Sequence, residues 1–121
     1  MIKPKKHKDM KVSDIVKSLD LKIYSGEGGL DRQVVGGYIS DLLSDVMGNA
    51  DMGQIWLTLQ THKNVMAIAS LKDLAAVILV DGHKPDENTA MQSNEENIPL
   101  LGTDLSAFEI TGRLYELIKH I

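Results

Sequence analysis

The chain has 121 residues, a net charge of −4 and no cysteine. This length fits a domain that buries a core without metal or disulfide support, and the lack of cysteine excludes disulfides, thiolate metal sites and a cysteine nucleophile. Residues 1–9 contribute +3 to the total, which leaves −7 on residues 10–121, so the folded body would repel a phosphate backbone and no nucleic-acid partner is expected.

The charge distribution also suggests the domain organisation. We expect residues 1–9 to form a basic flexible tail and residues 10–121 a single domain, because the first segment is charged and lacks an apolar pattern. The tail lacks the apolar stretch of a secretory signal, and no apolar run approaches the roughly 20 residues of a membrane-spanning helix. A cytoplasmic protein with no membrane partner is therefore expected.

Short strands alternate with helical patterns in the first half of the body. A helix capped by Ser13 precedes strands at residues 22–24 and 33–39. The glycine-rich turn at residues 25–29 indicates a direct connection between these two strands. Ser40 then caps a second helix, whose apolar residues recur at helical spacing.

The second half continues this alternation with longer apolar stretches. Strands are expected at residues 54–59 and 98–101, and the uninterrupted apolar run at residues 75–80 is typical of a strand buried on both faces of a parallel sheet. Helices are expected at residues 64–73 and from Pro85 to about residue 96. A last helix carries its apolar residues on one face: Ala107, Ile110, Leu114, Leu117, Ile118 and Ile121. The pattern predicts an α/β fold, a three-layer sandwich with a mainly parallel sheet flanked by helices.

The motifs that identify common enzyme and cofactor sites are missing. The sequence has no complete phosphate-binding loop, zinc helix, serine nucleophile elbow or dinucleotide fingerprint. His62 lacks a second histidine at ligand spacing, so no zinc site is expected there. Asp81, Asp86 and Glu87 surround one loop and would suit a hard cation, but their pattern is unspecific. The sequence thus predicts no metal site and leaves any cofactor unknown.

A polar cluster follows the predicted strand at residues 54–59. Thr61, His62 and Asn64 bring hydrogen-bonding groups of three shapes to a helix start, and His62 can change charge near neutral pH. Ligands of open α/β sheets collect outside the carboxyl ends of strands, so we expect a small-molecule site there. Its predicted residues are Thr61, His62, Asn64, Gly82, Lys84 and Thr103. The alternative is structural, with Thr61 as a helix N-cap beside a hydrogen-bonded loop histidine.

Three segments of the sequence resemble DRTGG domains. Residues 77–87 match the strand, Gly-x-x-Pro loop and helix start of that family, and residues 95–103 contain its Ile-Pro-x-Leu strand. Residues 35–47 are similar to the corresponding segment of short stand-alone members. The resemblance covers about residues 10–108.

The resemblance implies a regulatory role. DRTGG domains accompany phosphotransacetylases and CBS-containing pyrophosphatases, and they are similar in fold to the N-terminal domains of HPr kinase and Mur ligases. Regulation or dimerisation is their supposed role. The sequence departs from the family at residues 61–64, where the Asp-Arg pair would fall, and at residues 81–82, in place of the later threonine-glycine pair. HPr kinase activity is not implied, because the catalytic phosphate loop of that enzyme lies in another domain.

Two functions follow as hypotheses. The first is a non-catalytic regulatory or ligand-sensing domain, a homodimer that binds a small polar metabolite or nucleotide, or a protein partner. The second is a small enzyme in which His62 acts with Asp41 or Asp45 as acid and base, provided that these side chains converge. A homodimer is expected because a short chain leaves several apolar faces uncovered. Four adaptable methionines are candidates for the subunit contact: Met47, Met52, Met66 and Met91.

Overall fold

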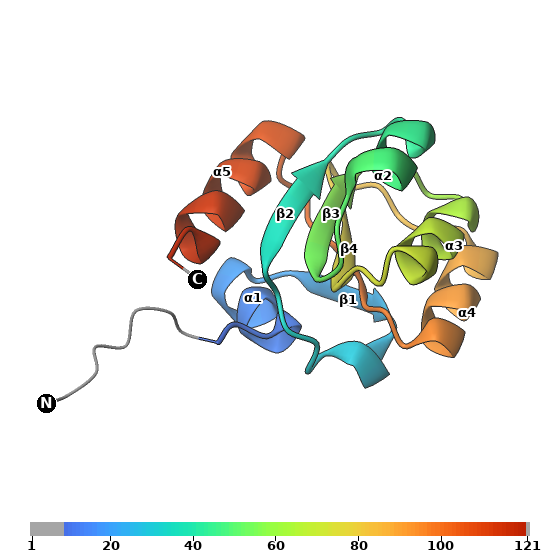
Figure 1. The fold of residues 1–121 in the computed structure, drawn as a ribbon, viewed down its shortest axis with the longest axis horizontal. Helices are drawn as coiled ribbons and strands as arrows, with labels where there is room; N and C mark the ends of the chain where they lie inside the picture. Colours follow the sequence, from blue (N-terminus) through green and yellow to red (C-terminus); the bar gives the residue numbers. More distant parts are fainter. Residues whose placement is uncertain (1–8, 121) are drawn as a thin grey trace, which may run out of the picture.

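The computed structural model describes residues 9–120 as a five-stranded sheet with helices on both faces (Figure 1). The flexible tail predicted for residues 1–9 thus lies, except for its last residue, outside the described residues. The strands are β1 (Lys22–Ser25), β2 (Gly36–Ile39), β3 (Gln54–Thr58), β4 (Ala76–Leu79) and β5 (Leu100–Gly102). The helices are α1 (Val12–Leu19), α2 (Leu43–Asn49), α3 (Asn64–Leu71), α4 (Glu87–Glu96) and α5 (Ala107–Ile118), with a 3-10 turn η1 (Glu27–Gly29).

The sheet has the strand order β1-β5-β4-β3-β2. Strands β2 to β5 run parallel to one another, and β1 pairs antiparallel with β5. Helices α2, α3 and α4 connect the parallel strands and lie on one face, whereas α1 and α5 lie on the other (Figure 1). The predicted three-layer sandwich with a mainly parallel sheet is confirmed.

Buried apolar side chains fill both spaces between the sheet and the helices. Because side chains alternate along a strand, Trp56 and Val77 pack toward α2, α3 and α4, while Ile55 and Ile78 pack toward α1 and α5. All four side chains are completely buried, which explains the apolar sequence of both central strands. Met66 is also completely buried in the core, so its prediction as a subunit contact is wrong.

Helix α5 has the apolar face that the sequence predicts. Ile110, Leu114 and Ile118 are buried against the sheet, and Ala107 and Leu117 pack beside them. The last residue of the predicted face lies outside the described residues. Within residues 9–120, no helix is long and apolar enough to cross a membrane.

The strands on either side of the glycine-rich turn are not neighbours. β1 and β2 form opposite edges of the sheet, although the chain passes from one to the other without an intervening α-helix, as the predicted strand-to-strand connection requires. The strand predicted at residues 33–39 begins only at Gly36, and Gln33 instead forms an isolated bridge with Lys11. The glycine-rich turn does not indicate this strand order, because turn residues determine the local backbone geometry and not which strands pair.

Two helix starts also differ from the predictions. Lys11, not Ser13, is the N-cap of α1, and the Asp14 carboxylate accepts a hydrogen bond from the Lys11 backbone N–H at 2.9 Å. Ser40 lies ahead of α2, where its hydroxyl accepts a hydrogen bond from the Leu42 N–H at 3.1 Å. In both places a side chain bonds to a nearby backbone group just outside the helix, which moves the helix boundary.

Candidate functional site

The six predicted ligand-binding residues lie beyond the carboxyl ends of neighbouring strands. Thr61, His62 and Asn64 follow β3, Gly82 and Lys84 follow β4, and Thr103 follows β5. Because these three strands are parallel and adjacent, the six residues share one edge of the sheet, which we call the carboxyl edge.

The β4–α4 loop opens with a tight turn that contains Gly82. Asp81 and Gly82 have φ values of 58° and 75°, and the His83 N–H donates to the Val80 carbonyl at 3.1 Å. Two left-handed central residues closed by this bond define a type I′ turn, for which Asp-Gly is a favoured pair. The Nδ1 atom of His83 also lies 3.2 Å from the Val80 carbonyl oxygen. This turn therefore has a local structural reason for its glycine.

Backbone bonds join the Gly82 turn to the loop that carries Thr103. The Gly82 N–H donates to the Thr103 carbonyl at 2.9 Å, and the Asp81 N–H donates to the Leu105 carbonyl at 2.7 Å. Thr103 is nearly buried, and its hydroxyl accepts a hydrogen bond from the Leu105 N–H at 3.1 Å. Thr103 thus holds the loop, and its hydroxyl keeps its proton and one acceptor lone pair for a ligand.

The β3–α3 loop is fastened to the start of α4. The Thr61 carbonyl accepts hydrogen bonds from the Thr89 hydroxyl at 2.7 Å and from the Asp86 N–H at 3.2 Å. Nδ1 of His62 lies 3.4 Å from Oδ2 of Asp86, and both side chains are more than half exposed. Asp86 is the N-cap of α4, so this helix begins two residues after Pro85, the start expected from the sequence. The structure therefore gives His62 a carboxylate partner.

The N-cap role considered for Thr61 is not observed. Lys63 is the N-cap of α3, and the first helical amides donate to the carbonyls of His62 and Lys63. Asn64 and Lys84 are exposed at the carboxyl edge. The β3–α3 and β4–α4 loops thus bring Thr61 and His62 to α4, and the turn brings Gly82 to Thr103.

Acidic residues outweigh the positive charge of Lys84 at this edge. Asp81, Asp86 and Glu87 are exposed around Lys84. Within residues 9–120, no three histidine or acidic side chains are grouped so that they could hold a metal ion. The carboxyl edge therefore offers hydrogen-bonding groups of both polarities rather than a preformed cation site.

The acid–base pair of the enzyme hypothesis does not come together. Asp41 accepts hydrogen bonds from the Thr58 hydroxyl at 2.9 Å and from the Leu59 N–H at 2.8 Å. Among the described residues, His62 has no hydrogen bond or ion pair with Asp41 or Asp45. Asp41 instead joins the β2–α2 loop to the end of β3, a role that spacing along the sequence did not indicate.

Asp45 belongs to a separate polar contact between β2 and α2. Its carboxylate accepts hydrogen bonds from the Tyr38 hydroxyl and the Asn49 amide, each at 2.9 Å. The hydroxyls of Ser40 and Tyr38 hold the pKa of Asp45 below its usual value. The same carboxylate raises the pKa of Tyr38. Asp45 is therefore an ionised structural acceptor at neutral pH and not a proton donor.

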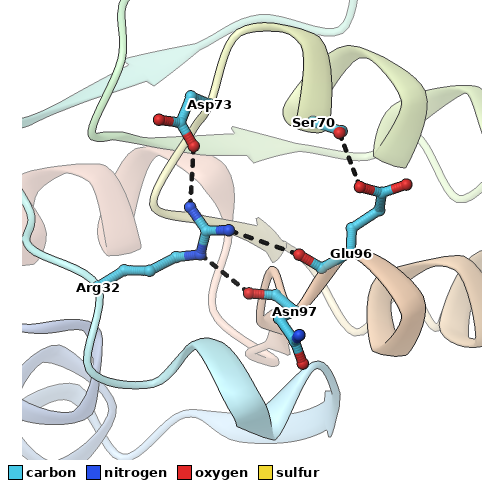
Figure 2. A network of polar contacts seen from close by, with 5 residues as sticks. All are labelled: Arg32, Ser70, Asp73, Glu96 and Asn97. Carbon is cyan, nitrogen blue, oxygen red and sulfur yellow. Dashed lines mark hydrogen bonds and ion pairs between the residues drawn. The ribbon is translucent and has the colours of Figure 1, made fainter.

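A second polar network lies around Arg32, near the opposite ends of the strands (Figure 2). The guanidinium donates to the Asp73 carboxylate at 3.1 Å, the Asn97 carbonyl at 2.9 Å and the Glu96 carbonyl at 3.5 Å. The Glu96 carboxylate accepts a hydrogen bond from the Ser70 hydroxyl at 2.8 Å. Arg32 thus ties the segment before β2 to the ends of α3 and α4. No local pattern in the sequence indicates this role, although the chain has just two arginines.

Replacement of Arg32 by alanine should lower the free energy of unfolding by about 2–3 kcal/mol. The substitution removes charge-assisted hydrogen bonds to two carbonyls at the end of α4 and leaves Asp73 without its cation. Urea unfolding followed by circular dichroism measures the change. Arg32→Lys keeps the charge but not the planar array of donors, so it should recover less than half of the loss. Full recovery by lysine would show that charge alone matters.

Two cavities lie away from the predicted site residues. One, of about 260 Å³, is lined in part by Arg32, Met52 and Asp73. The other, of about 100 Å³, lies between β2 and α5. Neither is lined by any of the six predicted residues, so the carboxyl edge is a rim of loops and not one of these cavities.

Comparison with known proteins gives a similarity of fold. No protein-family model and no curated protein sequence matches the chain. A solved structure of the CBS and DRTGG domains of the regulatory region of Clostridium perfringens pyrophosphatase, complexed with the activator diadenosine tetraphosphate, aligns with a TM-score of 0.68. The two chains are 14% identical over an alignment that covers 92% of this chain and 47% of the other. The resemblance to DRTGG domains predicted from the sequence is therefore confirmed at the level of the fold.

Proposed function

We propose that the chain is a non-catalytic ligand-sensing domain that binds a small polar metabolite or nucleotide at the carboxyl edge. The observation that carries this proposal is the placement of Thr61, His62 and Asn64 beside Gly82 and Lys84 at the ends of adjacent parallel strands. Ligands of open α/β sheets bind at this edge because loop side chains and backbone groups converge there. The fold it shares with a regulatory region supports a sensing role.

The charges at the carboxyl edge restrict the ligand. Lys84 can neutralise one negative charge of a ligand. His62 could neutralise a second one only in its protonated form, and the Asp86 carboxylate beside it would compete with the ligand for that positive charge. Asp81 and Glu87 would repel a polyphosphate unless a divalent cation accompanied it. A neutral or singly charged metabolite, or a nucleotide bound with Mg²⁺, therefore suits the site better than a free polyphosphate. The nucleotide activator of the structurally similar pyrophosphatase region makes adenine nucleotides the first probes.

Three further features belong to the proposal. The ligand-sensing unit is the single domain of residues 10–121, it works as a homodimer, and it resides in the cytoplasm. The homodimer is supported by exposed apolar side chains, of which Met52 is 66% exposed and Phe108 90% exposed. A dimer also lets ligand binding at one edge affect the relative position of two subunits.

Simultaneous replacement of His62 and Asn64 by alanine should weaken ligand binding about 5- to 150-fold, because the ligand loses one or two hydrogen bonds that together contribute about 1–3 kcal/mol. The ligand is first found by the rise in melting temperature with AMP, ADP, ATP, diadenosine tetraphosphate and central metabolites, with and without Mg²⁺. Isothermal titration calorimetry then compares the wild type with the double variant. Both side chains are exposed, so the variant should keep the fold.

A matched double variant at the opposite ends of the strands serves as the control. Gln33→Ala with Lys72→Ala likewise removes two polar side chains, one of them an amide, yet it should leave affinity unchanged because neither residue is at the carboxyl edge. Equal affinities of the wild type and the His62/Asn64 variant would place the site elsewhere. If none of the compounds raises the melting temperature, the proposed ligand-sensing role fails.

A further inference from the structure

Strand β2 is an edge of the sheet without a strand partner on its outer side within the described residues. Residues 34–40, which contain this strand, include no charged side chain and no proline. Proteins usually protect such an edge with lysine, proline or a bulge, because its free N–H and C=O groups can pair with another chain. Val35 and Ile39 are 61% and 47% exposed along it. The edge of β2 is thus open to a further strand.

A small apolar cavity opens beside this edge. Gly37 and Ile39 of β2 line it on one side and Tyr115 of α5 on the other, and its volume is about 100 Å³. Such a volume takes one side chain rather than a metabolite. Thr111 also lines the cavity, and its hydroxyl is buried without a hydrogen-bond partner among the described residues. A buried hydroxyl without a partner is rare, so the cavity lacks a polar group that a docked chain can supply.

The flank of α5 that carries Thr111 is apolar beyond the cavity. Phe108, Thr111 and Tyr115 are spaced i, i+3, i+7 and therefore share one side of the helix. Phe108 is 90% exposed and Tyr115 is 62% exposed. The charged residues Glu109 and Arg113 pair with each other at 2.9 Å and lie away from this flank. Together, β2, the cavity and the flank of Phe108 and Tyr115 form what we call the β2 surface.

We propose that the β2 surface is where a second copy of this chain docks, with the two β2 strands antiparallel and the two α5 helices side by side. The proposal rests on the proposed homodimer and assigns its surface. A two-fold interface uses the same patch on both subunits. That patch must therefore carry both a cavity and the protruding side chains that fill the partner's cavity. The β2 surface has both, in the cavity at Thr111 and the exposed rings of Phe108 and Tyr115.

Charge favours a second copy at this place. Residues 10–121 carry −7, so two copies repel each other wherever charged surfaces would meet. The β2 surface contributes no net charge, because residues 34–40 are uncharged and the two ion pairs of α5, Glu109 with Arg113 and Glu116 with Lys119, each sum to zero. Two copies can therefore approach here without a net like-charge repulsion. Dimerisation would form a continuous sheet of ten strands, twice the five in one chain.

Replacement of Tyr115 by glutamate should dissociate the dimer. The substitution places two carboxylates near each other across the two-fold axis and removes a ring that lines the cavity. Analytical ultracentrifugation of the full chain at about 50 μM should give twice 13.3 kDa for the wild type and 13.3 kDa for the variant. Phe108→Glu is a second variant, expected to weaken the dimer on the order of tenfold or more. Leu71→Glu, at a 69% exposed residue of α3, is the control and should stay dimeric.

Amide hydrogen exchange then tests the surface itself. In the wild type, exchange of the Gly36–Ile39 amides should slow as protein concentration rises, because pairing with a second β2 strand protects the outward N–H groups. A dimer that survives both glutamate substitutions and shows no such protection would overturn the β2 surface while leaving a homodimer in place. A monomeric wild type would overturn the β2 proposal and the homodimer together, but not ligand sensing at the carboxyl edge. Slowed exchange only after addition of another protein's extended peptide would assign the surface to that partner and also overturn the proposal.

Discussion

Replacement of Trp56 by alanine is expected to lower the free energy of unfolding by about 3–5 kcal/mol. Trp56 is the single tryptophan of the chain and is completely buried between β3 and the helices α2 and α3. Its removal leaves a large cavity that close-packed neighbours cannot fill. Urea unfolding must be followed by circular dichroism, because the variant has no tryptophan fluorescence.

The indole of Trp56 also forms a specific polar contact. Its Nε1–H donates a hydrogen bond to the Ser40 carbonyl at 2.8 Å, which connects β3 to the corner between β2 and α2. Trp56→Phe keeps most of the apolar volume but leaves that carbonyl without its donor, so it should cost about 1–3 kcal/mol. If phenylalanine were as destabilising as alanine, the hydrogen bond rather than the packing would dominate at this residue.

Replacement of Gly26 by alanine is expected to lower the free energy of unfolding by about 3 kcal/mol or more, the combined effect of a steric clash and a strained backbone. A Cβ atom at this residue would lie 2.2 Å from the Ile98 carbonyl oxygen. Its φ of 75° is in the left-handed region that non-glycine residues rarely adopt. The Gly26 N–H also donates to the Asn94 side chain at 2.7 Å, so any backbone shift would disturb that bond. Thermal and urea unfolding of the variant measure the loss.

Gly48→Ala is the matched control for this substitution. Gly48 lies within α2, and a Cβ atom there would have no atom within 4 Å other than its local helix neighbours. Alanine should therefore stabilise the protein by about 0.5–1 kcal/mol through its helix propensity. A Gly26→Ala variant as stable as the wild type would show that the turn before η1 can move away from Ile98.

The amino-acid sequence by itself determined the identity of most elements. Strand β4 could be predicted because Ala76–Leu79 is apolar without interruption, and α5 because Ile110, Leu114 and Ile118 recur at helical spacing. The alternation of these elements was sufficient to predict a mainly parallel sheet. Such patterns are local, since each depends on residues within one or two turns of helix or one strand.

The candidate site was predictable to the same extent. Strand ends could be located, so Thr61, His62, Gly82 and Thr103 could be assigned to one edge of the sheet. The residues that these side chains contact could not be predicted. The contact between His62 and Asp86 joins loops that follow different strands, and no spacing along the chain indicates it.

Only the tertiary structure decided which distant segments meet. It placed β1 and β2 on opposite edges although one glycine-rich turn and a short loop separate them. It also brought Arg32 to the carbonyls of Glu96 and Asn97 and placed Gly26 against Ile98. The physical reason is that pairing and packing between distant segments depend on the burial of both faces of the sheet at once. The local pattern of each segment is compatible with several strand orders, and the order is selected by the complete core.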